Sequence, residues 1–210
     1  MEIVRPIKEP FPHLIIENLY DDEELELIWE ELEFLNKLEK LNVPENYGAA
    51  GKTNDKNEHY YSTNAKGLNL ENIYNVRNIS NILRVNRKIF KYAQTYSNLS
   101  PHHLKFLKAN FDITKIRYYE NGDSYLPHAD YFFDTLACTY FYKKPKKFAG
   151  GELFFPQFDN YEIPCIDNCC IIFPCCFIHG VKKIHLENND YNSKYGRYCM
   201  SQFTNAILND

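Results

Sequence analysis

The sequence predicts an α+β fold that is mainly β, with two helices in the N-terminal half and a sandwich or jelly-roll barrel in the C-terminal half. Helical apolar spacing occurs twice before residue 100, and short aromatic or β-branched runs separated by turn residues follow residue 106. The 210 residues are 44% hydrophobic, which is enough for a sizeable core. We therefore expect one domain over residues 1–210, with supporting elements in residues 1–100 and the barrel in residues 101–210.

The first two predicted elements are a strand and a helix. Residues 10–20 have the composition of an apolar strand, and residues 21–40 carry apolar side chains at the spacing of one helix face. Asp21 or Asp22 is the expected N-cap, because a carboxylate there accepts hydrogen bonds from the free N–H groups of the first turn. The apolar face would consist of Leu25, Ile28, Leu32 and Leu35.

A long linker precedes the second predicted helix. Residues 43–69 are rich in Asn, Gly, Lys and Tyr without a helical period, which indicates an irregular loop with a short strand near Tyr60. Residues 70–97 regain helical spacing and are predicted to form a helix. Its apolar stripe would comprise Ile73, Val76, Ile79, Leu83 and Phe90.

The rest of the chain alternates short apolar runs with turn residues, a pattern typical of a β-sandwich or barrel. The runs are "DITKIRYY", "TLACTYFY", "GELFFP", "NCCIIFP", "HGVKKI" and "RYCMSQFTNA". Gly150 and Gly151 open one of these strands, and we expect them to permit a bulge or a close approach of the backbone.

Charge and cysteine usage narrow the class of protein. The net charge is -4 and no long Lys/Arg cluster occurs, so we do not expect a nucleic-acid partner. No segment has the apolar character of a secretory signal or a membrane span. The seven Cys are an odd number without a signal peptide, which predicts reduced thiols in the cytoplasm. Their adjacent spacing disfavours a metal site, and we expect them to be buried as small hydrophobic residues on strands.

The triplet His128-Ala129-Asp130 follows a turn rich in glycine and tyrosine. Residues two apart on a strand share a face, so the imidazole and the carboxylate would lie side by side as metal ligands. His179, at the start of a later strand, is the candidate third ligand, whereas the competing His185 lies in a polar stretch. Two His and one carboxylate leave coordination positions open, an arrangement that suits non-heme Fe(II) enzymes that activate oxygen.

Residues 110–206 resemble the 2-oxoglutarate- and Fe(II)-dependent oxygenases, most closely the prolyl 4-hydroxylase-like branch. The shared features, in chain order, are "RYYENGDSYLPHADYFFD", the Gly-Gly strand opening "AGGELFFPQ", the apolar strand "IDNCCIIFPCCFIHGVKKI" and the closing Gly-Arg strand "GRYCMSQF". The N-terminal "PFPHLIIENLYDDEELELI" is similar as well. The resemblance implies a double-stranded β-helix, or jelly-roll, with two N-terminal supporting helices.

The resemblance also implies an oxidative reaction at an iron bound by His128, Asp130 and His179. Fe(II), 2-oxoglutarate and O2 would give succinate, CO2 and a hydroxylated product, with ascorbate as a further candidate cofactor. An iron-dependent enzyme of this kind is an oxidoreductase, and these three side chains would be its catalytic centre.

The far carboxylate of 2-oxoglutarate needs a fixed cation when it leaves water, and Arg197 is the candidate. The resemblance places Tyr119 beside this carboxylate, with Tyr118 as the alternative because the strand parity is open. Ser201 would share the inward face of the last strand with Arg197. The family's basic residue usually follows the distal His more closely, so we interpret the polar residues 185–195 as an insertion between two strands.

The branch resemblance implies a peptidyl proline as the substrate. Tyr125, Tyr131 and Phe203, together with the Tyr-rich loop of residues 43–69, would form an aromatic groove for an extended peptide, unless these rings only fill the core. The alternatives are the same chemistry on a free amino acid, a small metabolite or nucleic acid, and a non-enzymatic jelly-roll that binds a metal or ligand. The sequence is compatible with a monomer but does not decide the oligomeric state.

Overall fold

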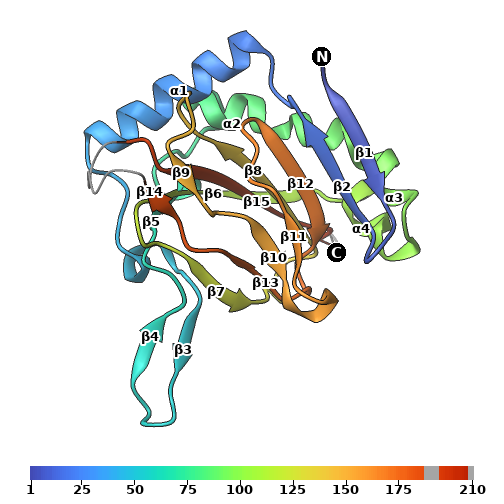
Figure 1. The fold of residues 1–210 in the computed structure, drawn as a ribbon. Helices are drawn as coiled ribbons and strands as arrows, with labels where there is room; N and C mark the ends of the chain where they lie inside the picture. The colour runs from blue at the N-terminus through green and yellow to red at the C-terminus, as the bar shows by residue number, and fades with distance from the viewer. Residues whose placement is uncertain (187–193, 208–210) are drawn as a thin grey trace.

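Two antiparallel β-sheets face each other in the computed structural model, which describes residues 1–186 and 194–207 (Figure 1). The larger sheet has the strand order β1 (Ile3–Ile7), β2 (His13–Glu17), β12 (Cys169–Pro174), β8 (Thr135–Phe141), β15 (Arg197–Asn205), β6 (Phe111–Tyr119) and β5 (Lys66–Asn69). The smaller sheet has the order β11 (Tyr161–Ile163), β10 (Leu153–Phe155), β13 (His179–Val181) and β7 (Tyr125–His128). Each of the six predicted apolar runs contains a strand, so the mainly β, jelly-roll-like prediction is confirmed.

The larger sheet separates two apolar layers. On β15, Tyr198 and Met200 belong to the layer beneath the helices, whereas Cys199 and Phe203 belong to the layer between the two sheets. Figure 1 shows the helices along one face of this sheet and the smaller sheet over the other face. Alternate residues of a single strand therefore serve the helical layer and the space between the sheets.

The first predicted helix is present as α1 (Asp22–Lys37). The Asp21 side chain accepts a hydrogen bond from Glu24 N, and the Glu24 side chain accepts one from Asp21 N, which forms a reciprocal capping box. The predicted apolar face is buried at Ile28, Leu32 and Leu35.

The prediction of one continuous helix over residues 70–97 is wrong. The segment is divided into η2 (Leu70–Asn72), η3 (Arg77–Ile79), α2 (Asn81–Val85), η4 (Asn86–Tyr92) and α3 (Ala93–Ser97), followed by η5 (Pro101–His103) and α4 (Leu104–Leu107). Ser80 has extended backbone geometry and its hydroxyl caps α2 by accepting from Leu83 N, so a helix restarts there instead of continuing. The predicted stripe is accordingly exposed at Ile73, Val76 and Ile79.

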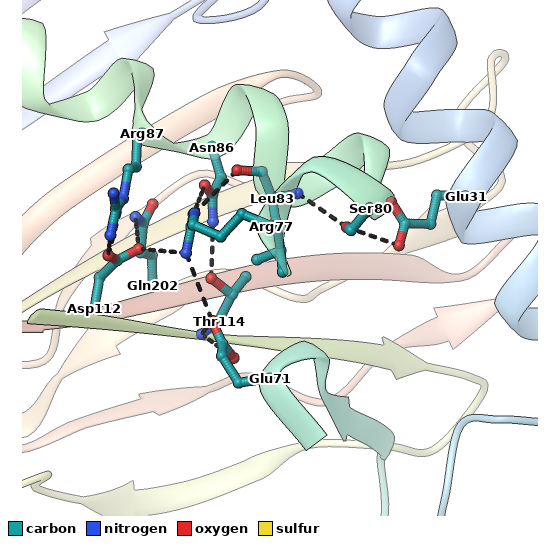
Figure 2. Close-up of polar contacts among 10 residues, drawn as sticks. All are labelled: Glu31, Glu71, Arg77, Ser80, Leu83, Asn86, Arg87, Asp112, Thr114 and Gln202. Atoms are coloured by element: carbon teal, nitrogen blue, oxygen red, sulfur yellow. Dashed lines mark hydrogen bonds and ion pairs between the residues drawn. The ribbon is translucent and has the colours of Figure 1, made fainter. Parts of the chain in front are cut away.

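Buried polar contacts attach this divided segment to the larger sheet (Figure 2). Asp112 of β6 accepts hydrogen bonds from Arg87 Nη2 at 2.6 Å and Gln202 Nε2 at 2.9 Å, and forms an ion pair with Arg77 at 3.3 Å. Asn86 Nδ2 donates to the Thr114 hydroxyl at 2.8 Å. These side chains satisfy one another where apolar packing is interrupted, and they tie the helical layer to β6 and β15.

On the α1 side, the same divided segment is held by Glu31, whose carboxylate accepts a hydrogen bond from Ser80 Oγ at 2.9 Å and one from Ile82 N at 2.7 Å. Glu71, at the other end, accepts from Thr114 N at 2.9 Å. The Glu31 carboxylate therefore replaces the backbone acceptor that a continuous helix would have supplied to Ile82 N, whereas Glu71 ties the start of the segment to strand β6.

The linker of residues 43–69 is more ordered than a loop. It contains η1 (Pro44–Tyr47), β3 (Gly51–Thr53), β4 (His59–Tyr61) and β5, and β4 is the strand predicted near Tyr60. β3 and β4 form a hairpin that projects from the barrel beside β7 (Figure 1). Leu126 N of β7 donates to Ser62 O at 2.7 Å, which ties the base of the hairpin to the smaller sheet.

Three other sequence predictions concern the insertion, the cysteines and membrane spans. Of the predicted insertion at residues 185–195, His185–Leu186 form β14, which pairs with β9 (Phe148–Ala149), whereas residues 187–193 lie outside the described residues. Every cysteine is a free thiol, and all except Cys176 are buried, as expected of small hydrophobic residues. Among the described residues, no helix has both the length and the apolar character needed to cross a bilayer.

Candidate active site

His128, Asp130 and His179 converge at the edge of the smaller sheet. β7 and β13 pair antiparallel with His128 opposite His179. Asp130 lies just beyond the end of β7 and is positioned by its backbone N, which donates to Cys175 O at 3.0 Å. One ligand atom from each of the three side chains can be chosen so that all lie within 4.8 Å of one another. The structure thus brings together the three residues that the sequence predicted as a metal site.

Backbone carbonyls orient both imidazoles. His128 Nδ1 lies 2.9 Å from Leu126 O, and His179 Nδ1 lies 2.8 Å from Phe177 O. A carbonyl oxygen only accepts hydrogen bonds, so each Nδ1 must carry a proton and each neutral ring presents an unprotonated Nε2. Orientation by a hydrogen bond at the second nitrogen is the usual arrangement around metal-binding histidines.

The unprotonated atoms face the same point. Asp130 Oδ2 is 3.8 Å from His128 Nε2 and 3.4 Å from His179 Nε2. Three lone-pair donors at these distances repel one another unless a cation lies between them. Ligands about 2.1 Å from one metal and at right angles would be roughly 3 Å apart, close to the observed separations. The donor set therefore fits a divalent metal ion.

Burial and neighbouring charges set the protonation states. The pKa of His128 is lowered to about 3, first by burial and then by the adjacent His179. Burial alone would raise the pKa of Asp130, but contact with His179 and the positive charge of Arg117 outweigh it, so this pKa is lowered. Near neutral pH the site consequently presents a neutral imidazole at His128 and an ionised carboxylate at Asp130, the forms that bind metal.

Arg197 lies across the cavity on β15, paired with Tyr119 of β6. Its side chain is 0% exposed, and none of its three nitrogens has a hydrogen-bond partner within residues 1–186 and 194–207. The guanidinium lies over two ring faces, at 4.9 Å from the Tyr119 centroid and 4.2 Å from the Tyr140 centroid, and beside the thiols of Cys165 and Cys199. A buried cation without an anion is costly, so Arg197 is suited to receive a carboxylate.

The Gly-Gly strand opening allows the backbone to pass beside Arg197. Gly150 and Gly151 have φ of +79° and +80°. A Cβ at residue 150 would lie 2.0 Å from Lys183 O, and one at residue 151 would lie 3.1 Å from Arg197 Cδ. The predicted close approach at these glycines is confirmed, because no other residue combines this φ with the available space.

A cavity lies between the sheets, and its space together with the solvent at its mouth is about 330 Å³. It connects the three candidate metal ligands with Arg197. The predicted residues that line it are His128, Asp130, His179, Arg197, Tyr119, Ser201, Tyr125 and Phe203. The sequence thus predicted eight of the side chains that the structure brings together here.

Two predicted residues lie elsewhere. Tyr118, the alternative to Tyr119, faces the helical layer, and its hydroxyl accepts from Gly196 N at 3.2 Å. Tyr131 is 74% exposed and borders a separate groove with His102, Lys105 and Phe133. The aromatic groove expected from the sequence is therefore divided, with Tyr125 inside the cavity and Tyr131 outside it.

Sequence reasoning gave no role in the site to Arg117, Cys138 and Cys199, which also line the cavity. The signal was available for two of them. Arg117 is two residues before Tyr119 on β6, and Cys199 lies between Arg197 and Ser201 on β15, so strand alternation turns both inward once their neighbours face the cavity.

No protein-family model and no curated protein matches this sequence. Solved structures do match. A prolyl-4-hydroxylase from Pseudomonas putida aligns over 93% of both chains with a TM-score of 0.61 at 12% identity. A prolyl hydroxylase from Trichoplax adhaerens, in complex with a peptide fragment of the hypoxia inducible factor oxygen degradation domain, aligns over 92% of this chain and 83% of that chain with a TM-score of 0.59 at 11% identity.

A third structure, the viral collagen prolyl hydroxylase of Paramecium Bursaria Chlorella virus-1 in its 2-oxoglutarate complex, covers 93% of this chain and 96% of its own with a TM-score of 0.54 at 14% identity. This chain has the prolyl 4-hydroxylase fold. The jelly-roll core that the sequence resemblance implied is thereby confirmed, but its second N-terminal helix is not. At such identities the prolyl 4-hydroxylase fold is what the similarity establishes, and the activity must be argued from the site.

Proposed function

We propose that this protein is a 2-oxoglutarate- and Fe(II)-dependent dioxygenase that hydroxylates an unactivated C–H bond, on a peptidyl proline. One observation carries the proposal. A single cavity has three metal-binding side chains at one side and, at the other, a buried guanidinium that has no hydrogen-bond partner among the described residues. A metal-chelating dicarboxylate would satisfy both, with one end beside the triad and the other at Arg197.

The chain's own residues would bind and orient the reactants. His128, Asp130 and His179 would hold Fe(II), which supplies the activation of O2 needed to attack the C–H bond. Arg197 would bind the far carboxylate of 2-oxoglutarate through parallel N–H donors. Burial raises the pKa of Tyr119, so its hydroxyl keeps its proton and is able to donate to the same carboxylate.

The remaining cavity wall excludes water from the reaction. Leu136, Leu153, Val181 and Phe203 present apolar side chains, and each is at most 7% exposed. Ser201 adds a hydroxyl on the face that carries Arg197. A dry, mostly apolar wall strengthens the few polar contacts inside the cavity and keeps reactive species from side reactions.

A peptide substrate is supported by the entrance to the site. The Tyr125 ring stacks on His128 with centroids 3.9 Å apart, and its hydroxyl accepts from Ala50 N beside the β3–β4 hairpin. Lys52 of β3 donates to Pro127 O at 2.8 Å. The hairpin is thus attached directly to the strand that carries His128, where an extended peptide would run past aromatic side chains, with Tyr131 as an outer contact.

Substrate-stimulated turnover tests the proposal. Purified protein with Fe(II), 2-oxoglutarate and ascorbate should release succinate, and proline-containing peptides should increase the rate and gain one oxygen by mass spectrometry. If the wild-type protein binds metal but forms no succinate, a non-enzymatic binding protein is favoured instead. Oxygen gain by a free amino acid or a nucleotide, and by no peptide, would replace the peptide assignment.

A further inference from the structure

Arg117 is a second buried guanidinium in the same cavity. Arg117 is 5% exposed, and its Nη1 donates to Ser201 Oγ at 2.9 Å. Its Nε has no hydrogen-bond partner among the residues that the structure describes. In the part of the chain that the structure describes, no carboxylate forms an ion pair with either Arg117 or Arg197. Two fixed cations therefore face a cavity whose only carboxylate, that of Asp130, belongs to the proposed metal site.

The two arginines lie against different rings of the cavity wall, although both are close to Tyr119 and Cys199. The Arg117 guanidinium lies 5.3 Å from the Tyr125 ring centroid, and that ring stacks on His128. It also lies 5.8 Å from the Tyr47 centroid, at the base of the β3–β4 hairpin. Arg197 instead contacts Tyr119 and Tyr140. Arg117 is thus on the side of the triad and the entrance, where the substrate would lie.

Charge balance leaves Arg117 without a counterion. A divalent metal with two neutral imidazoles and the Asp130 carboxylate carries one net positive charge. Together with Arg197 this matches the two negative charges of 2-oxoglutarate. Arg117 then adds one uncompensated positive charge in a buried cavity, which is costly unless a further anion arrives.

The protein offers one weak alternative anion. Contact with Cys138 and the positive charges of Arg197 and Arg117 lower the pKa of Cys199, which lies opposite Arg117 in the strand pairing. The Cys199 thiolate would be favoured by the unbalanced positive charge of the two arginines. When 2-oxoglutarate binds Arg197, part of that charge is neutralised and the thiolate is favoured less. Sulfur is also a poorer partner for a guanidinium fork than a carboxylate is.

We propose that Arg117 binds a carboxylate of the substrate and so selects an acidic substrate. The inference rests on the proposed dioxygenase function, since it places the substrate beside the triad. The carboxylate has two possible sources, the α-carboxylate of a free amino acid and the side chain of an acidic residue next to the target residue in a peptide. A planar guanidinium recognises both in the same bidentate manner.

Binding to the metal-loaded protein separates these sources without requiring turnover. Wild-type protein with Mn(II) and 2-oxoglutarate under anaerobic conditions is titrated calorimetrically with two matched pairs of probes. The first pair is L-proline and L-prolinamide, and the second is acetyl-Ala-Pro-Asp-amide and acetyl-Ala-Pro-Asn-amide. We expect one carboxylate probe to bind at least about tenfold more tightly than its uncharged partner, and the pair concerned identifies the source.

Variants then assign the preference to Arg117. In Arg117→Met, the affinities for the carboxylate probe and its uncharged partner should differ by no more than about twofold, and the 2-oxoglutarate affinity should change less than about threefold. Lys115→Met, which removes a cation two residues away on the same strand, should retain the preference. If Arg117→Met does not fold by circular dichroism, Arg117→Lys decides, because a point charge without the fork should give a smaller but measurable preference.

Several results would overturn the inference. The first is equal binding of both members within each probe pair. The second is a carboxylate preference that is unchanged in the Arg117 variant or equally lost in Lys115→Met. The third is a tenfold or greater loss of 2-oxoglutarate affinity in Arg117→Met. The last result would make Arg117 part of the cosubstrate site. Failure of the proposed function is distinct from all of them, because it would show in the wild-type protein itself, either as absent binding of Mn(II) and 2-oxoglutarate or as absent succinate formation despite binding.

Discussion

His128 and His179 lie directly opposite each other on β7 and β13, with ring centroids 4.5 Å apart and each Nδ1 held by a backbone carbonyl two residues earlier in its own chain segment. On both strands the ring is fixed by the same hydrogen bond, from Nδ1 to the carbonyl oxygen two residues earlier. Their free nitrogens therefore need no rearrangement to accept a metal, which is the basis of the first prediction.

We expect His128→Ala and His179→Ala each to lower the Mn(II) affinity at least about 100-fold, because an outer contact alone is worth 10–100-fold and these are the ligands themselves. Isothermal titration calorimetry measures this. His185→Ala, on the exposed residue of β14, is the matched control and should bind Mn(II) as wild type does. Wild-type affinity in either ligand variant would exclude this metal site.

Arg197→Met should separate cosubstrate binding from metal binding. Losing one partner of a buried charge pair costs about 2–5 kcal/mol, so the affinity for 2-oxoglutarate should fall at least about 30-fold while Mn(II) still binds. The variant without ligand should unfold at the same or a higher temperature, because the substitution removes an uncompensated buried charge. Lys183→Ala is the control, and a loss of 2-oxoglutarate binding there instead would move the anchor to Lys183.

The metal-free protein should lose stability as the pH falls from 6.5 toward 3. The pKa of His128 is 6.5 in the unfolded chain and about 3 in the fold, so over this range the unfolded state binds a proton that the folded state does not. Each pH unit then costs up to about 1.4 kcal/mol. Urea unfolding across this window should show a shallower slope in His128→Gln; an identical slope would show that His128 titrates normally.

Shortening the β3–β4 hairpin should affect the peptide more than the cosubstrate. Replacing residues 52–60 by a short Gly-Ser linker removes the Lys52 contact to Pro127 O but leaves the cavity wall intact. We expect the KM for a proline-containing peptide to rise several-fold, with little change in peptide-independent succinate formation. Equal losses in both assays would mean that the hairpin supports the fold rather than the substrate.

The helical layer should depend strongly on Asp112. Its side chain is 2% exposed and pairs with Arg77 and Arg87, whose side chains are 27% and 54% exposed, and with the buried Gln202. Asp112→Ala leaves the buried Gln202 Nε2 unpaired and should cost about 1–3 kcal/mol in the free energy of unfolding. Glu33→Gln, which breaks the exposed pair with Lys143, should cost no more than about 1 kcal/mol. Comparable urea midpoints for the two variants would contradict the role assigned to the network in Figure 2.

The sequence was sufficient for features that depend on local pattern. The Asp21 cap, the α1 face and the strands that carry His128, His179 and Arg197 all follow from spacing or turn residues. The metal-binding triad could be predicted because its three members have distinctive chemistry, and two of them are two residues apart.

Features that depend on long-range contacts were not predictable. The helical period in residues 70–97 was real, but Glu31 and Asp112 bind polar groups from distant elements and favour short segments over one helix. Arg117 was overlooked because a lone strand arginine usually faces solvent, and only the parity of Tyr119 places it in the cavity. The prediction that Tyr131 lines the groove with Tyr125 was wrong because β7 ends at His128, so the alternation of strand residues no longer applies at residue 131.

Gly151 gives the site a mutational sensitivity that its own chemistry does not explain. It carries no charge and no side-chain donor, yet one added methyl group would press on the Arg197 side chain and on Ile184 Cδ1, which would lie 2.5 Å away. In random mutagenesis scored by 2-oxoglutarate turnover, residue 151 should therefore tolerate substitution as poorly as the proposed metal ligands do. An inhibitor that wedges between this glycine and Arg197 would act without touching the metal.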